Sequence, residues 1–212
     1  MSISTRKFLF FRWIVTNGYS FGSPWAAWLV GLNAIAAVAV SIFCAPGAVG
    51  VLGAGLALLM LAIAVNDWNH FIIPDALTGM SLGLALVRAV LQEPNDIWIS
   101  VGSAVLRAAV LALIFLLLRL TYRQIRGREG IGLGDIKLAA VAGAWLDWPM
   151  MLVAVQIAAC TALLIYPIRQ YALGLPIRAK SRLPFGLFFA PAIWISWVLE
   201  TILWAPVSMG SP

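Results

Sequence analysis

Two aspartates stand where long apolar stretches meet polar residues, and a pair of aspartates can hydrolyse a peptide bond. Asp67 comes at the end of one apolar stretch, and Asp135 opens another directly after the glycine-rich segment 130–134. An ionisable side chain beside such stretches is energetically costly and marks a functional site by default. We therefore take Asp67 and Asp135 as the candidate catalytic residues, on the condition that the fold brings them together.

The two aspartates are predicted to lie at opposite ends of their helices, which suggests different roles. At a helix C-terminus the backbone dipole disfavours an anion, so Asp67 is expected to hold a proton. At a helix N-terminus free N–H groups favour an anion, so Asp135 is expected to be ionised. Asp135 would then take a proton from the attacking water while Asp67 polarises the peptide carbonyl. This chemistry requires no metal and no cofactor, and the coupled pair titrates as a unit.

Gly132 and Gly134 precede Asp135 and admit two interpretations. A residue without Cβ lets another backbone come close, so these glycines could admit a substrate peptide beside the carboxylate. Alternatively, Asp135 is an N-cap residue after a flexible loop, with no catalytic role. The spacing Gly-x-Gly-Asp by itself leaves both interpretations open.

Other polar residues near the two aspartates carry competing roles. Pro74 suits the first turn of a helix. Asp75 is a second candidate for the first catalytic acid, or a carboxylate that only stabilises that first turn. Lys137 either keeps Asp135 charged or faces lipid head groups. His70, the only histidine, has no second histidine to share a metal and is expected to be interfacial.

The elements that position these residues follow from composition. Of the 212 residues, 63% are hydrophobic and 10% are charged, whereas soluble domains carry about 25% charged residues. Residues 13–66 contain no charged side chain, which is enough for two membrane spans. The net charge of +6 does not indicate nucleic-acid binding, because the basic residues lie between apolar stretches. The sequence therefore predicts an all-α polytopic membrane protein.

The apolar stretches divide the chain into about seven transmembrane helices. Residues 1–23 mix basic and aromatic side chains and are expected to form an amphipathic segment on the membrane surface. Residues 24–212 form the transmembrane domain, whose fifth span is short. The expected spans are about 25–43, 49–66, 74–91, 97–118, 135–147, 150–168 and 184–204.

The distribution of basic residues predicts the orientation. With the N-terminus in the cytoplasm, all 14 lysines and arginines except Arg88 and Arg107 fall on the cytoplasmic side. Asp67 and Asp135 then both lie at the cytoplasmic edge. Arg88 is expected to extend to the interface at the outer end of its span. Arg107 either pairs with a buried carboxylate or, as we favour, reaches the interface too.

Three segments resemble signatures of the type IV prepilin peptidases, which are membrane aspartic proteases of the GxGD class. Residues 132–138, followed by 143–146, resemble the second signature, and Asp67 with residues 74–78 resembles the first. Pro184-Phe185-Gly186 is similar to a late segment of the family. The resemblance covers about residues 49–204 and implies that Asp67 and Asp135 are the catalytic pair, with the other signature residues shaping the site.

The resemblance also implies a substrate and a location. Members cleave basic leader peptides from prepilins and pseudopilins at the cytoplasmic face of the inner membrane. Larger members carry paired CxxC motifs associated with N-methylation of the product, whereas the two cysteines here, Cys44 and Cys160, form no such motif. We therefore expect cleavage without methylation. The oligomeric state is left open.

Two other functions compete with this one. In an ion-coupled transporter or channel, Asp67 and Asp135 would relay protons or bind a cation. Such folds often have internal repeats and sites at the midplane, whereas both aspartates are expected at one interface here. A catalytically inactive scaffold that binds pilins is the other possibility, and the presence of both aspartates argues against it.

Overall fold

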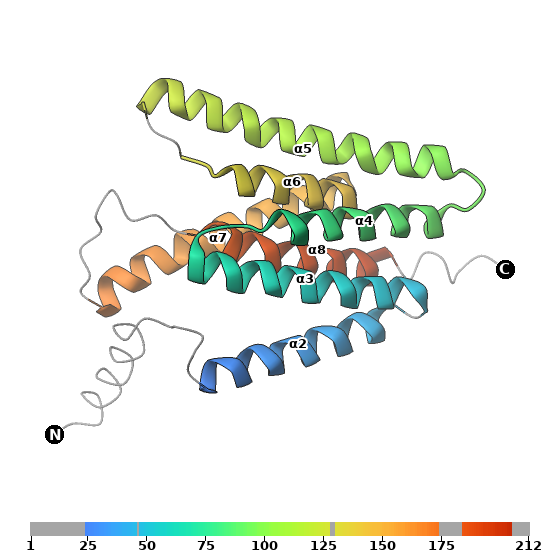
Figure 1. Cartoon of the computed structure of the whole chain (residues 1–212), viewed down its shortest axis with the longest axis horizontal. Helices are drawn as coiled ribbons and strands as arrows, with labels where there is room; N and C mark the ends of the chain where they lie inside the picture. The colour runs from blue at the N-terminus through green and yellow to red at the C-terminus, as the bar shows by residue number, and fades with distance from the viewer. Residues whose placement is uncertain (1–23, 46, 128–129, 174–183, 205–212) are drawn as a thin grey trace.

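The computed structural model describes residues 24–45, 47–127, 130–173 and 184–204, and within these residues the chain forms seven helices and no strand (Figure 1). The all-α prediction is confirmed. The helices are α2 (Pro24–Cys44), α3 (Ala48–His70), α4 (Asp75–Gln92), α5 (Ile97–Arg126), α6 (Leu133–Trp145), α7 (Trp148–Leu173) and α8 (Gly186–Trp204).

Five of these helices are long and apolar enough to cross a membrane. They are Ala27–Cys44, Ala48–His70, Ile97–Arg126, Trp148–Ile165 and Gly186–Leu203. The fifth expected span, α6, is short as predicted, with 13 residues. The chain is therefore an integral membrane protein whose two remaining described helices, α4 and α6, pack among the longer ones.

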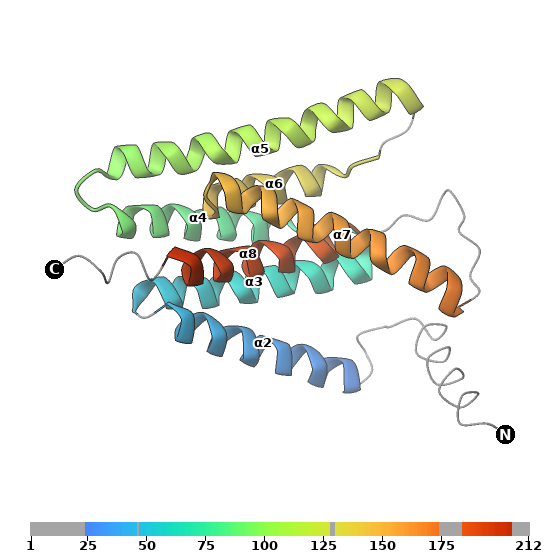
Figure 2. The ribbon, with the colours of Figure 1, turned by 180° about the vertical axis from the view of Figure 1, so that it is seen from behind.

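The helices form a bundle with α3, α6 and α8 inside it and α2 and α5 at opposite flanks (Figures 1 and 2). Almost every residue of α6 from Leu138 onward is buried, including Trp145 at its end. In contrast, α2 and α5 expose large apolar side chains such as Trp28 and Trp98, which suits contact with lipid. The bundle therefore shields α6 from lipid and surrounds it with protein.

Helices α3 and α5 are longer than their apolar stretches. The second expected span ends at residue 66, but α3 continues to His70, so Asp67 lies inside its last turn. The helix ends where Phe71 adopts a left-handed conformation (φ 54°) and donates its N–H to the Asp67 carbonyl at 2.9 Å. Likewise α5 runs to Arg126, well beyond residue 118. The polar residues at these ends extend the helices because helical backbone bonding does not require an apolar side chain.

Asp67 and Asp135 lie at the same end of the bundle, as expected. There α3 ends and α4, α6 and α8 begin (Figure 1); we call this the aspartate end and the opposite one the far end. The predicted surface segment 1–23 and most of the basic loop before α8 lie outside the described residues.

Of the predictions for the two arginines inside the apolar stretches, the one for Arg88 needs correction. Arg88 does not extend to the interface: it is 6% exposed and forms an ion pair with Glu200 at 3.0 Å. The guanidinium of Arg107 lies 3.7 Å from the half-exposed carboxylate of Asp147, so Arg107 has the carboxylate partner of the other alternative, although this partner is not buried; its reach to the interface stays a prediction. Glu200 and Asp147 come from distant parts of the sequence, so a charge count along the chain could not pair them.

Candidate active site

Asp67 lies in the last turn of α3 and points its carboxylate at the start of α8. The residue is 5% exposed, and its Oδ2 accepts a hydrogen bond from the Leu187 N–H at 2.9 Å. The Gly186 N–H also bonds to this carboxylate. These are the first N–H groups of α8, which have no partner inside the helix and stabilise negative charge. The buried surroundings act in the opposite direction and favour the protonated acid.

Asp135 occupies the third position of α6, two residues after the helix begins. Its Oδ2 accepts the Gly132 N–H at 3.1 Å, so the side chain reaches back over the first turn. It is therefore not the N-cap residue of the alternative interpretation, although it does satisfy one free backbone group. This carboxylate stays partly accessible because it sits at the end of the helix.

The pKa of Asp135 is shifted in the direction opposite to the one that the helix dipole favours, although the group is still ionised at neutral pH. Burial raises the pKa of Asp135 from 3.8 to about 6. The hydrogen bond from Gly132 lowers this pKa, and the negative charge of Asp67 raises it. The two carboxyl groups, 68 positions apart in sequence (135 − 67), therefore lie near enough to influence each other electrostatically.

The Ile73 side chain lies between the start of α6, which carries Asp135, and the start of α8, which binds Asp67. A methyl group added at Gly134 would lie 2.9 Å from Ile73 Cβ. A methyl group added at Gly186 would lie 2.8 Å from Ile73 Cδ1 and 2.7 Å from Asp67 Oδ2. Glycine at both positions therefore lets α6 and α8 close on the same side chain, and this brings Asp135 and Asp67 together.

The predicted role of the glycines changes accordingly. Gly134 has the Ile73 side chain against it and leaves no open space for a substrate backbone. Gly132 is exposed, and a methyl group there would lie 3.2 Å from Asp135 Oδ2. Close approach of a substrate thus stays a prediction for Gly132 alone.

The connection between α3 and α4 is shaped by residues that the sequence did not single out. The Asn66 side-chain amide donates to the Ile72 carbonyl, and the left-handed Phe71 starts the turn. Pro74 is extended (φ −66°, ψ 133°) and precedes α4 as its N-cap residue, one position before the predicted first turn. No motif marks Ile73 or Asn66, because an apolar loop residue and a single amide have no distinctive pattern.

An aromatic cluster holds the start of α8 in place. Phe115 of α5 stacks on Phe189 at 5.6 Å between ring centroids, and Phe185 lies 5.4 Å from Phe189. Pro184, before Phe185, is buried. The late segment Pro184-Phe185-Gly186 therefore anchors the two N–H groups that contact Asp67.

Asp75 and Lys137 form an ion pair with each other at the surface. Their side chains are 77% and 45% exposed. Lys137 thus contacts Asp75 and not Asp135, so the interpretation in which it keeps Asp135 charged is not supported by its contacts. His70 is exposed, and the described residues contain no group of three His, Cys, Asp or Glu placed to hold a metal ion.

Residues 54–168, which include Asp67, Asp75 and Asp135, match the Type IV leader peptidase family. The chain belongs to this family. Relatives that carry the name prepilin leader peptidase/N-methyltransferase include one from Aeromonas hydrophila, 30% identical over 169 residues, which are 78% of this chain and 55% of the relative. A second, from Burkholderia pseudomallei strain K96243, is 35% identical over 163 residues, which are 74% of this chain and 49% of the relative.

This leader peptidase family member therefore spans about half the length of the curated relatives it matches. A third relative of the same name, from Dichelobacter nodosus, is 31% identical over 139 residues, which are 66% of this chain and 45% of the relative. No solved structure matches the chain.

Asp75→Asn is expected to leave peptidase activity within about threefold of the parent chain, because an exposed ion pair contributes only about 0–1 kcal/mol. The measurement is the rate of leader cleavage by the purified variant. The matched variant is Lys137→Gln, which removes the other partner of the ion pair. A loss of activity as complete as for a catalytic residue would make Asp75 the first acid in place of Asp67.

Proposed function

We propose that this protein is a membrane aspartic endopeptidase that removes basic leader peptides from prepilins or pseudopilins. The observation that carries the proposal is the meeting of Asp67 and Asp135 at one end of the bundle, from two separate helices, in a member of the Type IV leader peptidase family. Neither carboxylate has a lysine or arginine partner among the contacts described above, so one proton shared by the pair is the natural state.

In the proposed reaction, ionised Asp135 accepts a proton from a water molecule as the water attacks the scissile carbonyl. Asp67 donates a hydrogen bond to the carbonyl oxygen and stabilises the negative charge that develops there. Collapse of the tetrahedral intermediate breaks the C–N bond, and the proton taken up by Asp135 passes to the leaving amine. The N–H groups of Gly186 and Leu187 hold the Asp67 carboxyl in position throughout.

The substrate fits the site by its two-part chemistry. A prepilin has a basic leader followed by a long apolar helix, and that helix can lie in the bilayer beside the exposed apolar faces of the bundle. The leader junction then reaches the aspartate end, where the negative charge of the Asp67 and Asp135 pair attracts lysine and arginine. We place this end at the cytoplasmic face of the inner membrane, with the N-terminus in the cytoplasm, on the distribution of basic residues.

The test is cleavage by the purified protein in lipid nanodiscs of a tagged prepilin with a basic leader. We expect a size shift, one new N-terminus, and no added methyl group by mass spectrometry. A prepilin with its leader lysines and arginines replaced by glutamine is the matched control and should be cleaved more slowly. No cleavage of any of several prepilins and pseudopilins would contradict the proposal, and a methylated product would contradict only the expectation of cleavage without methylation.

The rate of cleavage is expected to rise with pH through about 6, because burial raises the pKa of Asp135 to about 6 and Asp135 acts in its ionised form. The measurement is kcat/KM for one prepilin between about pH 4.5 and 8. If the rate instead falls as the pH rises through this value, Asp135 is the general acid and Asp67 the general base, the reverse of the proposed roles.

A further inference from the structure

The C-terminal end of α6 lies inside the protein, away from the aspartates. Its 13 residues make a helix about 20 Å long, shorter than the apolar core of a bilayer, which is about 30 Å thick. Trp145 and Leu146 at this end are fully buried. The last carbonyl groups of a helix have no partner inside it, so those of α6 must be satisfied by other parts of the protein.

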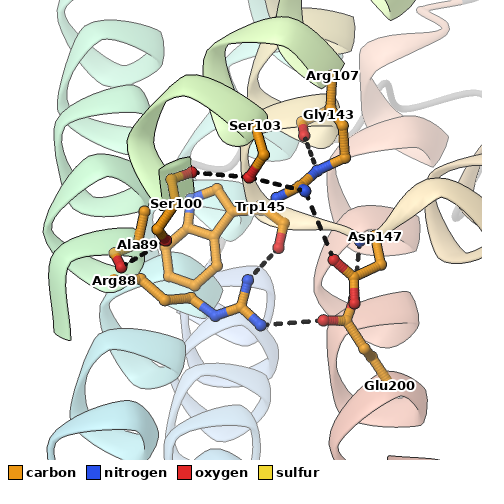
Figure 3. A network of polar contacts seen from close by, with 9 residues as sticks. All are labelled: Arg88, Ala89, Ser100, Ser103, Arg107, Gly143, Trp145, Asp147 and Glu200. Atoms are coloured by element: carbon orange, nitrogen blue, oxygen red, sulfur yellow. Dashed lines mark hydrogen bonds and ion pairs between the residues drawn. The ribbon is translucent and has the colours of Figure 1, made fainter. Parts of the chain in front are cut away.

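Two arginines from neighbouring helices supply the missing donors. Arg107 of α5 donates from Nε to the Gly143 carbonyl at 3.3 Å. Arg88 of α4 donates from Nη1 to the Trp145 carbonyl. Figure 3 shows both side chains converging on the end of α6. This end is thus closed by side chains from two other helices.

Acidic residues hold the two guanidinium groups in place. Arg88 Nη2 lies 3.0 Å from Glu200 Oε1, and both side chains are 7% exposed. The other oxygen of Glu200 accepts the Asp147 N–H at 3.3 Å, directly after α6 (Figure 3). Arg107 lies 3.7 Å from the Asp147 carboxylate. We call Arg88, Arg107, Asp147 and Glu200 the far-end network; it ties α6 to α4, α5 and α8.

Close packing reinforces this anchoring. A methyl group at Gly143 would lie 2.4 Å from the backbone oxygen of Arg107, so α5 and α6 touch through their backbones here. The Trp145 indole N–H donates to the Ser81 carbonyl at 3.0 Å, and the Arg88 guanidinium lies 5.5 Å from the centre of that ring. At the aspartate end, the ion pair that holds α6 is the exposed one between Lys137 and Asp75. The far end is therefore the firmer attachment of α6.

We propose that Arg88, Arg107 and Glu200 are positioning residues for peptide cleavage. They fix the position of α6 along its own axis, and therefore the position of Asp135 relative to Asp67. Asp135 precedes Trp145 by ten positions (145 − 135), which is about 15 Å of helix. Loss of the network lets α6 shift, and a shift of about 1 Å between reacting groups costs about 100-fold in rate. The inference rests on the proposed function, in which Asp135 is catalytic.

The test compares three variants in the prepilin assay. The double variant Arg88→Met/Glu200→Met removes the buried ion pair without leaving a lone charge. Soluble proteins tolerate such a replacement of a buried ion pair by apolar residues. Arg107→Met removes the donor to Gly143, and its partner Asp147 is half exposed. The control is Ser41→Ala, because the fully buried Ser41 accepts the Trp194 indole N–H at 3.0 Å and so joins α2 to α8 outside the far-end network.

We expect kcat to fall about 10–100-fold in the double variant and about 3–10-fold in Arg107→Met. We expect KM to change by less than about threefold, because the substituted residues lie at the far end, away from the aspartates. We also expect the acid limb of the pH profile to move by about half a pH unit, because burial is the largest cause of the raised pKa of Asp135 and a shift of α6 changes that burial. Partial unfolding would lower the rate without moving this limb. Ser41→Ala should match the parent in kcat and in the position of the acid limb.

A folded double variant with kcat within about threefold of the parent and an unmoved acid limb would overturn the proposal. If the double variant does not accumulate in the membrane, kcat and the acid limb are measured for Arg107→Met instead. Parental values of both in that variant would equally overturn the proposal. Failure of the parent chain itself to cleave any prepilin is a separate outcome, which contradicts the proposed function before any variant is compared.

Discussion

Asparagine in place of either Asp67 or Asp135 abolishes leader cleavage, with an expected loss of about 10²–10⁴-fold or more. Asparagine at position 135 cannot take a proton from water. Asparagine at position 67 offers the carbonyl oxygen only an amide N–H, which is a far weaker acid than a carboxyl group, so each variant removes one half of the acid–base pair. Because the two groups act as a unit, the double variant should be no slower than either single one. The measurement is single-turnover cleavage of a tagged prepilin.

Both asparagine variants should remain folded, which separates catalysis from stability. The amide oxygen can still accept the N–H of Leu187 in one variant and that of Gly132 in the other. Since burial raises the pKa of Asp135 above its ordinary value, the charged form opposes folding, and stability is lost as the pH rises through about 6. At pH 7, Asp135→Asn should therefore unfold at a temperature no lower than that of the parent. Substantial activity in either variant would exclude that residue from the catalytic pair.

Gly186→Ala is expected to lower kcat about 100-fold, the second largest effect. The added methyl group would lie 2.7 Å from Asp67 Oδ2 and 2.8 Å from Ile73 Cδ1. The carboxylate cannot move aside without giving up the Leu187 N–H, so Asp67 leaves its position. Overpacking of this kind also costs about 1–3 kcal/mol of stability. Cleavage rate and thermal unfolding of the purified variant measure the two effects.

Gly83→Ala is the matched control for Gly186→Ala. Gly83 lies within α4, and a methyl group there would meet no atom within 4 Å. Alanine is the better helix former by about 0.5–1 kcal/mol, so this variant should keep parental activity and unfold at the same or a higher temperature. Parental kcat in Gly186→Ala would show that cleavage does not depend on the position in which α8 holds Asp67.

The sequence predicted those features that depend on local pattern. Apolar stretches without charge indicated the helices, and the short stretch after Asp135 indicated a short α6. The common location of Asp67 and Asp135 followed from the alternation of helix directions along the chain. The extension of α3 through Asp67 to His70 was missed, because hydropathy marks where apolar residues end and not where helical hydrogen bonding ends.

The other features that the sequence did not predict depend on partners distant along the chain. Arg88 looked like an interfacial side chain, because nothing near it in sequence reveals the carboxylate of Glu200. Lys137 lies two residues after Asp135, yet successive helical positions face different directions and its partner is Asp75 on α4. Ile73 has no polar group at all, and only its contacts with two glycines reveal its role.

The dependence of both ends of the bundle on α8 has a consequence for how the protein is made. The N–H groups that bind Asp67 and the carboxylate that binds Arg88 all come from this helix, which a ribosome synthesises after every other described helix. Until it arrives, Arg88 lacks its counter-ion and Asp67 lacks its donors. A nascent chain that has inserted the first helices therefore carries an unfinished aspartate pair, and hydrolytic competence comes only once α8 has been inserted.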